Sequence, residues 1–244
     1  MDYLNYPEKY LQEKGAILTA GEIAGQPSLW KRTAECFFGR WPEIAGFLET
    51  ATRGADHIML TGAGTSSFMG LSLEGVFFRR TGILCRAVAT TNIVSHPQDY
   101  FDKDRIPFIL SFARSGNSPE SCAALELADR FSKACFHLII TCDEKGSLAS
   151  YHSDNPVFTL VLPPQANDMG LAMTGSYSSM LLAGLLMVYG EERSFCEDQL
   201  AIQLDATGEV LQGELDKLRD IASRDFKRAI FLGSGELYGT AEEA

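Results

Sequence analysis

A strand-forming run passes directly into a small polar turn at Ile109-Leu-Ser-Phe-Ala-Arg-Ser-Gly-Asn-Ser-Pro-Glu120. Residues 109–112 are apolar or favour β-structure, whereas residues 115–118 carry no large apolar side chain. Ser118 is a natural N-cap for a following helix, because its hydroxyl can accept a backbone N–H. Pro119 suits the first helical position, since the N–H that proline lacks has no partner there. The stretch therefore predicts a buried strand, a tight turn and a helix.

A second strand and turn stand at His57-Ile-Met-Leu-Thr-Gly-Ala-Gly-Thr-Ser-Ser67. Gly62 and Gly64 allow the backbone to bend tightly and a ligand to approach it closely. Taken alone, either turn is an ordinary capped turn of an α/β protein. Together they offer backbone N–H groups and hydroxyls at two strand ends, where open α/β sheets bind ligands. We therefore predict one crevice that binds an anion, most often a phosphate.

The composition limits the classes of partner. The chain has 244 residues, of which 45% are hydrophobic and 22% charged, enough for one large or two modest domains. Its formal net charge of −11 argues against a nucleic-acid partner or an anionic membrane surface. A phosphate must then be bound by local donors, and Arg114 supplies a positive charge inside the second turn.

The cysteines and the N-terminus indicate a cytoplasmic protein. None of the six cysteines forms a C-x-x-C pair, and Cys135 and Cys142 flank a predicted strand, too far apart for one tight metal site. We interpret them as small buried side chains in a reducing compartment and expect no metal. The N-terminus lacks a basic, apolar leader, and the longest apolar run, residues 180–188, is far shorter than the roughly 20 residues that span a bilayer.

Strands alternate with helices along most of the chain, which is typical of an α/β fold with a doubly wound parallel sheet. The predicted strands cover residues 58–61, 85–89, 107–112, 135–141 and, at an edge, 157–162; the predicted helices cover 28–50, 67–81, 119–133 and 177–189. Residues 1–26 are expected to be irregular, because Gln26-Pro-Ser28 is a helix-start signal. Pro42 either breaks the first helix or starts a second one.

The C-terminus repeats the strand-and-turn pattern. Ile230-Phe-Leu-Gly-Ser-Gly235 mirrors Met59-Leu-Thr-Gly-Ala-Gly64, as the opening of a second copy of the same domain does. The sequence stops at Ala244, before a second sheet is complete, so we expect a truncated chain; alternatively, the last strand docks onto the first domain or a partner. The predicted parts are an N-terminal helical segment (1–52), a first α/β domain (53–192), a helical connector (193–225) and the start of a second domain (226–244).

The two turns resemble those of the sugar isomerase (SIS) domain family. The resemblance rests on Gly62-Ala-Gly-Thr-Ser66 and Ser111-Phe-Ala-Arg-Ser-Gly-Asn-Ser-Pro-Glu-Ser121. It is closest to AgaS-type proteins, described as galactosamine-6-phosphate deaminase/isomerases or tagatose-6-phosphate ketose/aldose isomerases, because residues 90–100, 137–142 and 170–174 also fall in that family's order. It covers residues 20–244 and implies a flavodoxin-like three-layer sandwich with N-terminal helices, in which two SIS domains follow one another.

The resemblance implies isomerisation and deamination of an amino-sugar 6-phosphate without a cofactor, in a homo-oligomer. Substrate-binding positions then fall on Gly64, Thr65, Ser66, Arg114, Ser115, Gly116, Asn117, Ser118 and Thr174. The Arg114 side chain reaches either the phosphate or solvent. The family's acid–base residues lie beyond Ala244, with Glu243 one turn before the catalytic carboxylate, so this chain carries the binding site but no identified catalytic residue.

Two other functions compete with the enzyme. A non-catalytic sugar-phosphate sensor would need the same turns, and no helix-turn-helix or basic patch links it to DNA. A dinucleotide-binding oxidoreductase is disfavoured, because Ser67 stands at the third glycine position and the next strand ends in Thr90 and Thr91, without a carboxylate for a ribose. A serine hydrolase is disfavoured still more strongly, because the sequence has no G-x-S-x-G elbow.

Overall fold

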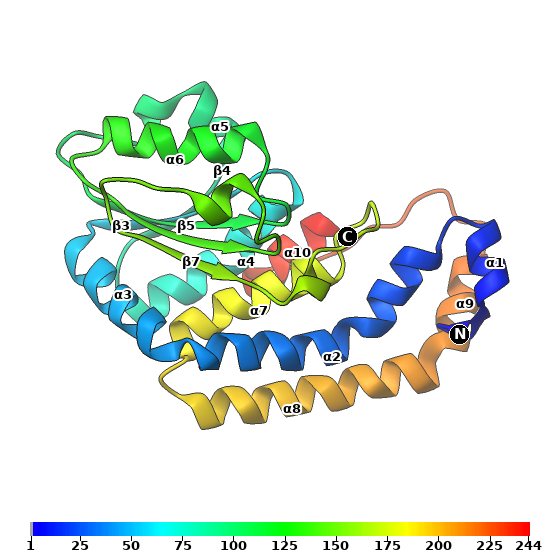
Figure 1. Ribbon diagram of the computed structural model, residues 1–244. Coiled ribbons are helices and arrows are strands. Elements are labelled where there is room, and N and C mark those ends of the chain that lie inside the picture. Colours follow the sequence, from blue (N-terminus) through cyan, green and yellow to red (C-terminus); the bar gives the residue numbers. More distant parts are fainter. Residues whose placement is uncertain (1) are drawn as a thin grey trace.

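The computed structural model describes residues 2–244 and centres on a parallel sheet (Figure 1). The strands lie in the order β4-β3-β5-β6-β7, with the bounds β3 (His57–Gly62), β4 (Cys85–Ala89), β5 (Pro107–Ala113), β6 (Phe136–Thr141) and β7 (Val157–Val161). Every residue of β5 is buried, as expected for a central strand covered on both faces. The predicted doubly wound parallel sheet is confirmed, and β7 is an edge strand as expected.

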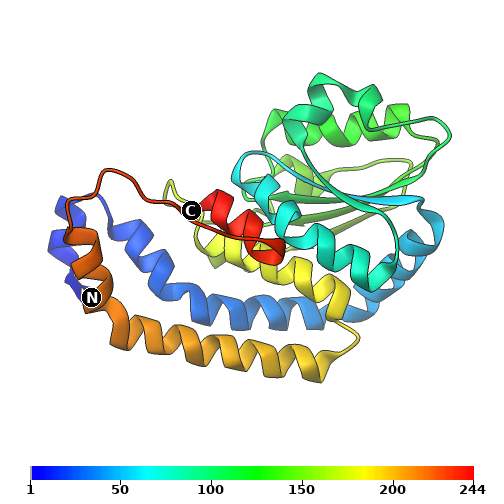
Figure 2. The same ribbon diagram turned by 180° about the vertical axis from the view of Figure 1, so that it is seen from behind.

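Helices cover both faces of the sheet (Figures 1 and 2). On one face lie α5 (Thr90–Ser95) and α6 (Pro119–Phe131). The other face is covered by α2 (Ile17–Gly39), α3 (Trp41–Gly54), α4 (Thr65–Thr81) and α7 (Gly175–Tyr189). This arrangement confirms the expected three-layer sandwich.

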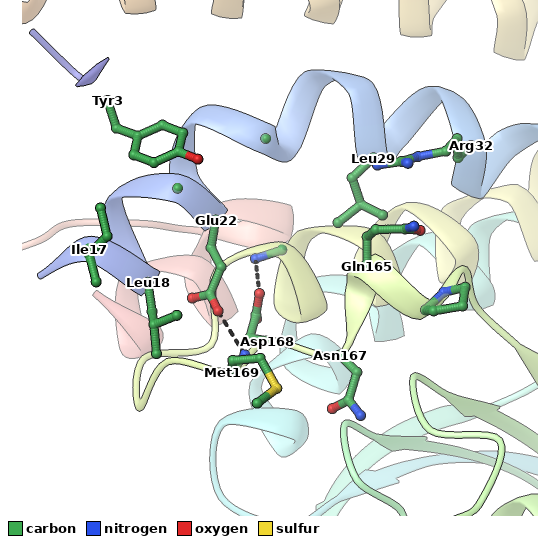
Figure 3. Close-up of a pocket in the computed structure, with 14 residues that line it drawn as sticks. Tyr3, Ile17, Leu18, Glu22, Leu29, Arg32, Gln165, Asn167, Asp168 and Met169 are labelled. Atoms are coloured by element: carbon green, nitrogen blue, oxygen red, sulfur yellow. Dashed lines mark hydrogen bonds between the residues drawn. The ribbon is translucent and has the colours of Figure 1, made fainter. Parts of the chain in front are cut away.

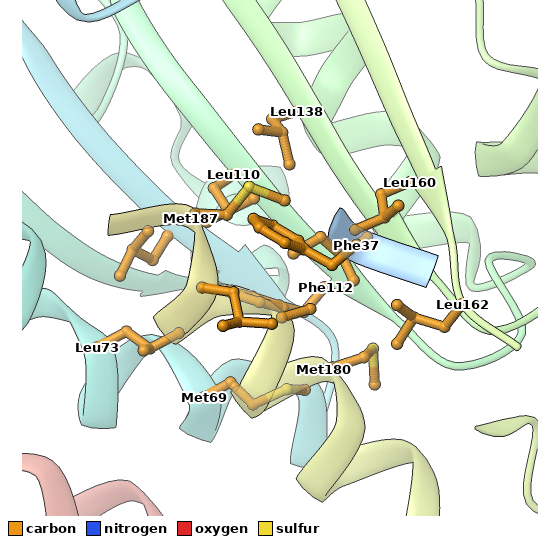
Figure 4. Packing of buried hydrophobic residues seen from close by; sticks show 14 of the residues in the cluster. Phe37, Met69, Leu73, Leu110, Phe112, Leu138, Leu160, Leu162, Met180 and Met187 are labelled. Carbon is orange, nitrogen blue, oxygen red and sulfur yellow. The ribbon is translucent and has the colours of Figure 1, made fainter. Parts of the chain in front are cut away.

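The larger core lies between the sheet and the second helical layer (Figure 4). Phe112 of β5 and Phe37 of α2 are both fully buried in this cluster. Met69 and Leu73 of α4 and Met180 of α7 are fully buried in the same cluster. Burying each such side chain stabilises the fold by about 1.5–3 kcal/mol, so this layer holds α2, α4 and α7 firmly against the strands.

The N-terminus is more ordered than its sequence predicts. Short strands β1 (Asp2–Tyr3) and β2 (Tyr6–Pro7) pair, α1 (Glu8–Glu13) follows, and α2 already begins at Ile17. The prediction of an irregular segment up to residue 26 was therefore wrong. Pro27 lies inside α2 instead of starting it, because packing of α2 against α7 outweighs the lost hydrogen bond, and Figure 1 shows that α2 bends.

A long helical arm follows α7 and leads to the C-terminal segment. It consists of α8 (Arg193–Glu209), a π-helical turn (Val210–Glu214) and α9 (Leu215–Ser223). In both ribbon views α8 runs beside α2. In the part of the chain that the structure describes, no helix combines the length and apolarity needed to cross a bilayer.

The strand expected at residues 228–232 is not formed. Residues 224–234 have no regular structure, and Ile230 and Leu232 are largely exposed. A strand needs a neighbour to satisfy its backbone groups, and no described strand pairs with this segment. The helix after the turn does form: α10 (Tyr238–Glu243) packs against α4, where Gly239 is buried and an added Cβ would lie 1.9 Å from the Phe68 carbonyl oxygen.

Candidate functional site

The sheet brings both predicted turns to one edge. β3 pairs in parallel with β4 on one side and β5 on the other, and Gly62 is in register with Phe112. Both strands therefore end side by side, and the turns at residues 63–66 and 114–118 follow directly. In this strand order the connections leave β3 and β5 in opposite directions, so the two turns stand at the topological switch point of the sheet, where open α/β sheets bind ligands. The predicted convergence of the two turns is present.

The first turn is shaped by its glycines. An added Cβ at Gly62 would lie 2.5 Å from the backbone carbon and oxygen of Ser66, so only glycine allows α4 to start so close to β3. Gly64 has a φ of +55°, which side chains rarely tolerate, and stands directly before α4. Ser66 is 4% exposed, so its hydroxyl lies beneath the turn surface, whereas Gly64 is exposed and Thr65 is partly exposed.

The second turn is braced by a loop that sequence reasoning overlooked. Gly116 has a φ of +64° and is buried. An added Cβ at Gly146 would lie 2.1 Å from the carbonyl oxygen of Ser115. Beside it, Ser147 donates both its backbone N–H and its hydroxyl to Asn117 Oδ1, at 3.0 and 3.1 Å. Asn117 thus supports the turn with its side-chain oxygen and leaves other groups to meet a ligand.

The serine hydroxyls of the second turn remain able to donate. Ser115 Oγ accepts the N–H of Asn117 at 3.3 Å, which leaves its own proton for a ligand. Ser118 stands at the predicted N-cap position of α6, but its hydroxyl makes no capping hydrogen bond. These hydroxyls and the positive end of α6 together favour an anion at this edge.

Arg114 contacts a neighbouring loop. Its Nη1 donates to the carbonyl oxygen of Gly170 at 3.2 Å, and the residue is half-buried. The sequence left open whether this side chain meets phosphate or solvent; the structure adds a third role, in which it ties the second turn to the segment before α7. Leu171, beyond that bond, is 97% exposed.

Asp168 is a buried residue that accepts several hydrogen bonds and that was not identified from the sequence. Its carboxylate accepts the N–H groups of Thr174, Gly175 and Ser176 at 2.9, 3.1 and 2.8 Å, and the Ser176 hydroxyl at 2.5 Å. It therefore caps α7 from a position seven residues before that helix starts. The predicted site residue Thr174 lies within this cap, and its hydroxyl approaches Asp168 at 3.4 Å. In the sequence, only the polar pair at residues 167–168 could have indicated this capping role.

A carboxylate from the C-terminal helix reaches the first turn. Desolvation raises the pKa of the Glu243 carboxyl in α10 above the usual value and outweighs the lowering effect of the nearby Thr65 side chain. The hydroxyls of Tyr177 and Thr240 lie 3.3 Å apart and add a second contact between α10 and the first domain. Alignment by pattern alone had left Glu243 outside the binding site.

A cluster of metal-ligand types lies away from the turns, at the start of β6. Asp129 Oδ1 is 2.8 Å from His137 Nε2, and Cys135 Sγ is 3.1 Å from each. A tetrahedral ion with bonds of about 2.0–2.3 Å separates its ligand atoms by roughly 3.3–3.8 Å. The observed spacing is that of hydrogen bonds, and Tyr151 and Asn155 also donate to Asp129. Cys135 is buried as predicted, but as a hydrogen-bonding group.

Comparison with known proteins agrees with this geometry. The model of the SIS domain family matches residues 53–189. The chain is 37% identical over 249 residues to a D-galactosamine-6-phosphate deaminase AgaS of Escherichia coli, covering 98% of this chain and 63% of that protein.

Two solved structures are also similar. A Clostridium novyi protein, provisionally described as a tagatose-6-phosphate ketose/aldose isomerase, superposes with a TM-score of 0.95 at 38% identity, covering all of this chain and 62% of that one. A tagatose-6-phosphate ketose/aldose isomerase from Escherichia coli gives 0.79 at 36% identity, covering 94% and 63%. The chain thus spans about three fifths of the length of these relatives.

Proposed function

The chain belongs to the SIS domain family, and from that premise we propose that it binds a phosphorylated amino sugar between its two turns, as part of a sugar-phosphate isomerase and deaminase. The observation that carries the proposal is the pairing of two hydroxyl-bearing turns at the carboxyl ends of β3 and β5. A negatively charged protein needs such local donors to hold a phosphate.

The names of the relatives point to galactosamine 6-phosphate as the substrate, with tagatose 6-phosphate and ammonia as products. The chemistry balances without a redox cofactor. A proton leaves C2 of the open-chain amino aldose and another is added at C1, which gives a ketose imine. Water then adds to the imine carbon, and the C–N bond breaks to release ammonia.

In this chemistry the phosphate group takes no part in the reaction but anchors the substrate. Its binding energy fixes the sugar and lets a carboxylate reach the reacting carbon. Glu243 lies near Thr65 of the first turn, and desolvation raises the pKa of its carboxyl. We include it in the proposed site as a proton-transfer candidate.

A non-catalytic sugar-phosphate sensor is the second candidate, because the same turns would serve it. Ammonia release by the whole protein from galactosamine 6-phosphate separates the two functions. Release at a rate that depends on the protein supports the enzyme, whereas tight binding without release supports the sensor.

Calorimetric titration with galactosamine 6-phosphate tests the binding proposal directly, with unphosphorylated galactosamine as the matched ligand. We expect saturable binding of the phosphorylated sugar and no measurable binding of the other. Equal affinity for both sugars, or none for either by folded protein, would contradict a phosphate handle at these turns.

Replacing Ser115 with alanine is expected to weaken binding of the sugar phosphate about tenfold, because a hydroxyl donor is lost from the crevice. The free energy of unfolding should change by less than about 0.5 kcal/mol, since the 3.3 Å bond to Asn117 is weak. Calorimetry and urea unfolding measure the two quantities. The control is Ser223→Ala on the exposed surface of α9; equal affinities of both variants would remove Ser115 from the site.

A further inference from the structure

The segment 169–173, here called the site loop, is joined to the N-terminal helix by one side chain. Glu22 of α2 accepts the backbone N–H of Met169 on its Oε1 at 2.7 Å (Figure 3). The same oxygen accepts the N–H of Gly170 at 2.8 Å. Its Oε2 is buried and has no hydrogen-bond partner among the described residues. These contacts link positions almost 150 residues apart in the sequence.

We propose that Glu22 is a positioning residue that sets the site loop beside the sugar-phosphate turns, an inference that rests on the proposed function. Gly170 is held from two sides: its N–H donates to Glu22, and its carbonyl oxygen accepts Arg114 Nη1 of the second turn at 3.2 Å. Any shift of Glu22 therefore moves the residue that contacts the second turn.

The space around Gly170 supports the same conclusion independently. An added Cβ there would lie 2.7 Å from Glu22 Oε2 and 3.1 Å from Thr19 Oγ1. A side chain at residue 170 would therefore press directly on the Glu22 carboxylate, so the loop packs closely against the side chains of α2 at this point. Beside this contact, residues of α2 and of the segment 164–169 line a cavity of about 580 Å³ (Figure 3). Since side chains do not fill that space, the Glu22 carboxylate is a main direct link between helix and loop.

The second half of the loop is held by Met173, which packs against the larger core, whereas the first half has little else to hold it in place. Asp168 accepts the backbone N–H groups of Thr174 and Gly175 and so fixes the chain directly after the loop. Met169 and Leu171, in contrast, are 78% and 97% exposed. Exposed side chains contribute no burial energy to the position of the loop. Backbone hydrogen bonds to Glu22 and from Arg114 therefore determine where its first half lies.

Glu22→Ala tests this role against Glu22→Gln, whose side-chain oxygen can still accept both N–H groups. For Glu22→Ala we expect about tenfold weaker binding of galactosamine 6-phosphate, unchanged binding of inorganic phosphate, and at least about tenfold faster hydrogen exchange at Met169 and Gly170. Glu22→Gln should keep most of the affinity for galactosamine 6-phosphate and most of the protection of the Met169 and Gly170 amides from hydrogen exchange. Glu35→Ala, at an exposed position of the same helix, is the control.

The two readouts separate the possible failures. If the wild type binds no sugar phosphate, the proposed function fails, while hydrogen exchange still reports whether Glu22 holds the loop. Unchanged exchange in Glu22→Ala would overturn the positioning role. So would equal losses of sugar-phosphate and inorganic-phosphate affinity, because a general structural defect affects both ligands alike.

Discussion

Replacing Asp129 with alanine is expected to lower the free energy of unfolding by about 3 kcal/mol. The carboxylate accepts hydrogen bonds from His137, Tyr151 and Asn155 at 2.8, 2.5 and 2.8 Å, and Cys135 Sγ approaches it at 3.1 Å. Alanine leaves these groups without their shared acceptor, and His137 is fully buried. Leaving a buried donor unpaired costs its full desolvation, which exceeds the value of an average hydrogen bond.

The effect should depend on pH. Burial by itself raises the pKa of Asp129, but the hydrogen bonds from His137, Tyr151 and Cys135 outweigh burial and hold the pKa well below its ordinary value. A carboxyl with a depressed folded-state pKa stabilises the fold above its unfolded pKa of about 4, and this contribution is lost as the pH falls further. The difference between wild type and Asp129→Ala should therefore shrink below about pH 4.

Urea unfolding at several pH values measures this difference. Glu126→Ala is the matched control, because it removes an exposed carboxylate from the same helix, α6. We expect the control to change stability by less than about 0.5 kcal/mol. If Asp129→Ala resembled Glu126→Ala at neutral pH, the network would be dispensable for the fold.

The strands and turns of the first domain could be predicted because their signals are local. At residues 57–67 and 109–120 an apolar run, a glycine or serine turn and a helix start follow one another without interruption. Each element needs only its own sequence and a sheet to join. The segment at residues 228–235 carries the same signal but forms no strand, since strand formation depends on a pairing neighbour that the pattern does not contain.

The supports of the site were missed because they come from distant parts of the chain. Asp168 caps a helix that starts several residues later, and Glu22 bonds a loop from another helix. Neither Asp168 nor Glu22 belongs to a sequence motif or to a residue spacing that indicates its role. The helix start predicted at Pro27 was wrong for a related reason: the packing of α2 on α7, which the local pattern does not contain, extends the helix past Pro27. Sequence patterns identify the groups that face a ligand more readily than the groups that hold them.

Replacing Gly146 with alanine is expected to weaken binding of the sugar phosphate about hundredfold, the largest effect on function that we predict. Gly146 has φ −66° and ψ 149°, a conformation open to any residue, so glycine is required there for space. An added Cβ would lie 2.1 Å from the Ser115 carbonyl oxygen and 3.2 Å from Gly116 Cα. An ordinary contact of about 3.5 Å requires that the second turn and residue 146 move apart by roughly 1.4 Å.

A shift of that size displaces both serine hydroxyls and the N–H groups of the turn together, which is why the loss should exceed that of Ser115→Ala. Calorimetry with galactosamine 6-phosphate measures it, and circular dichroism confirms that the variant is folded. Gly46→Ala, in α3 where an added Cβ meets no atom within 4 Å, is the control and should bind normally. Wild-type affinity in folded Gly146→Ala would mean that the second turn tolerates displacement, and hence that the phosphate is held mainly by the first turn.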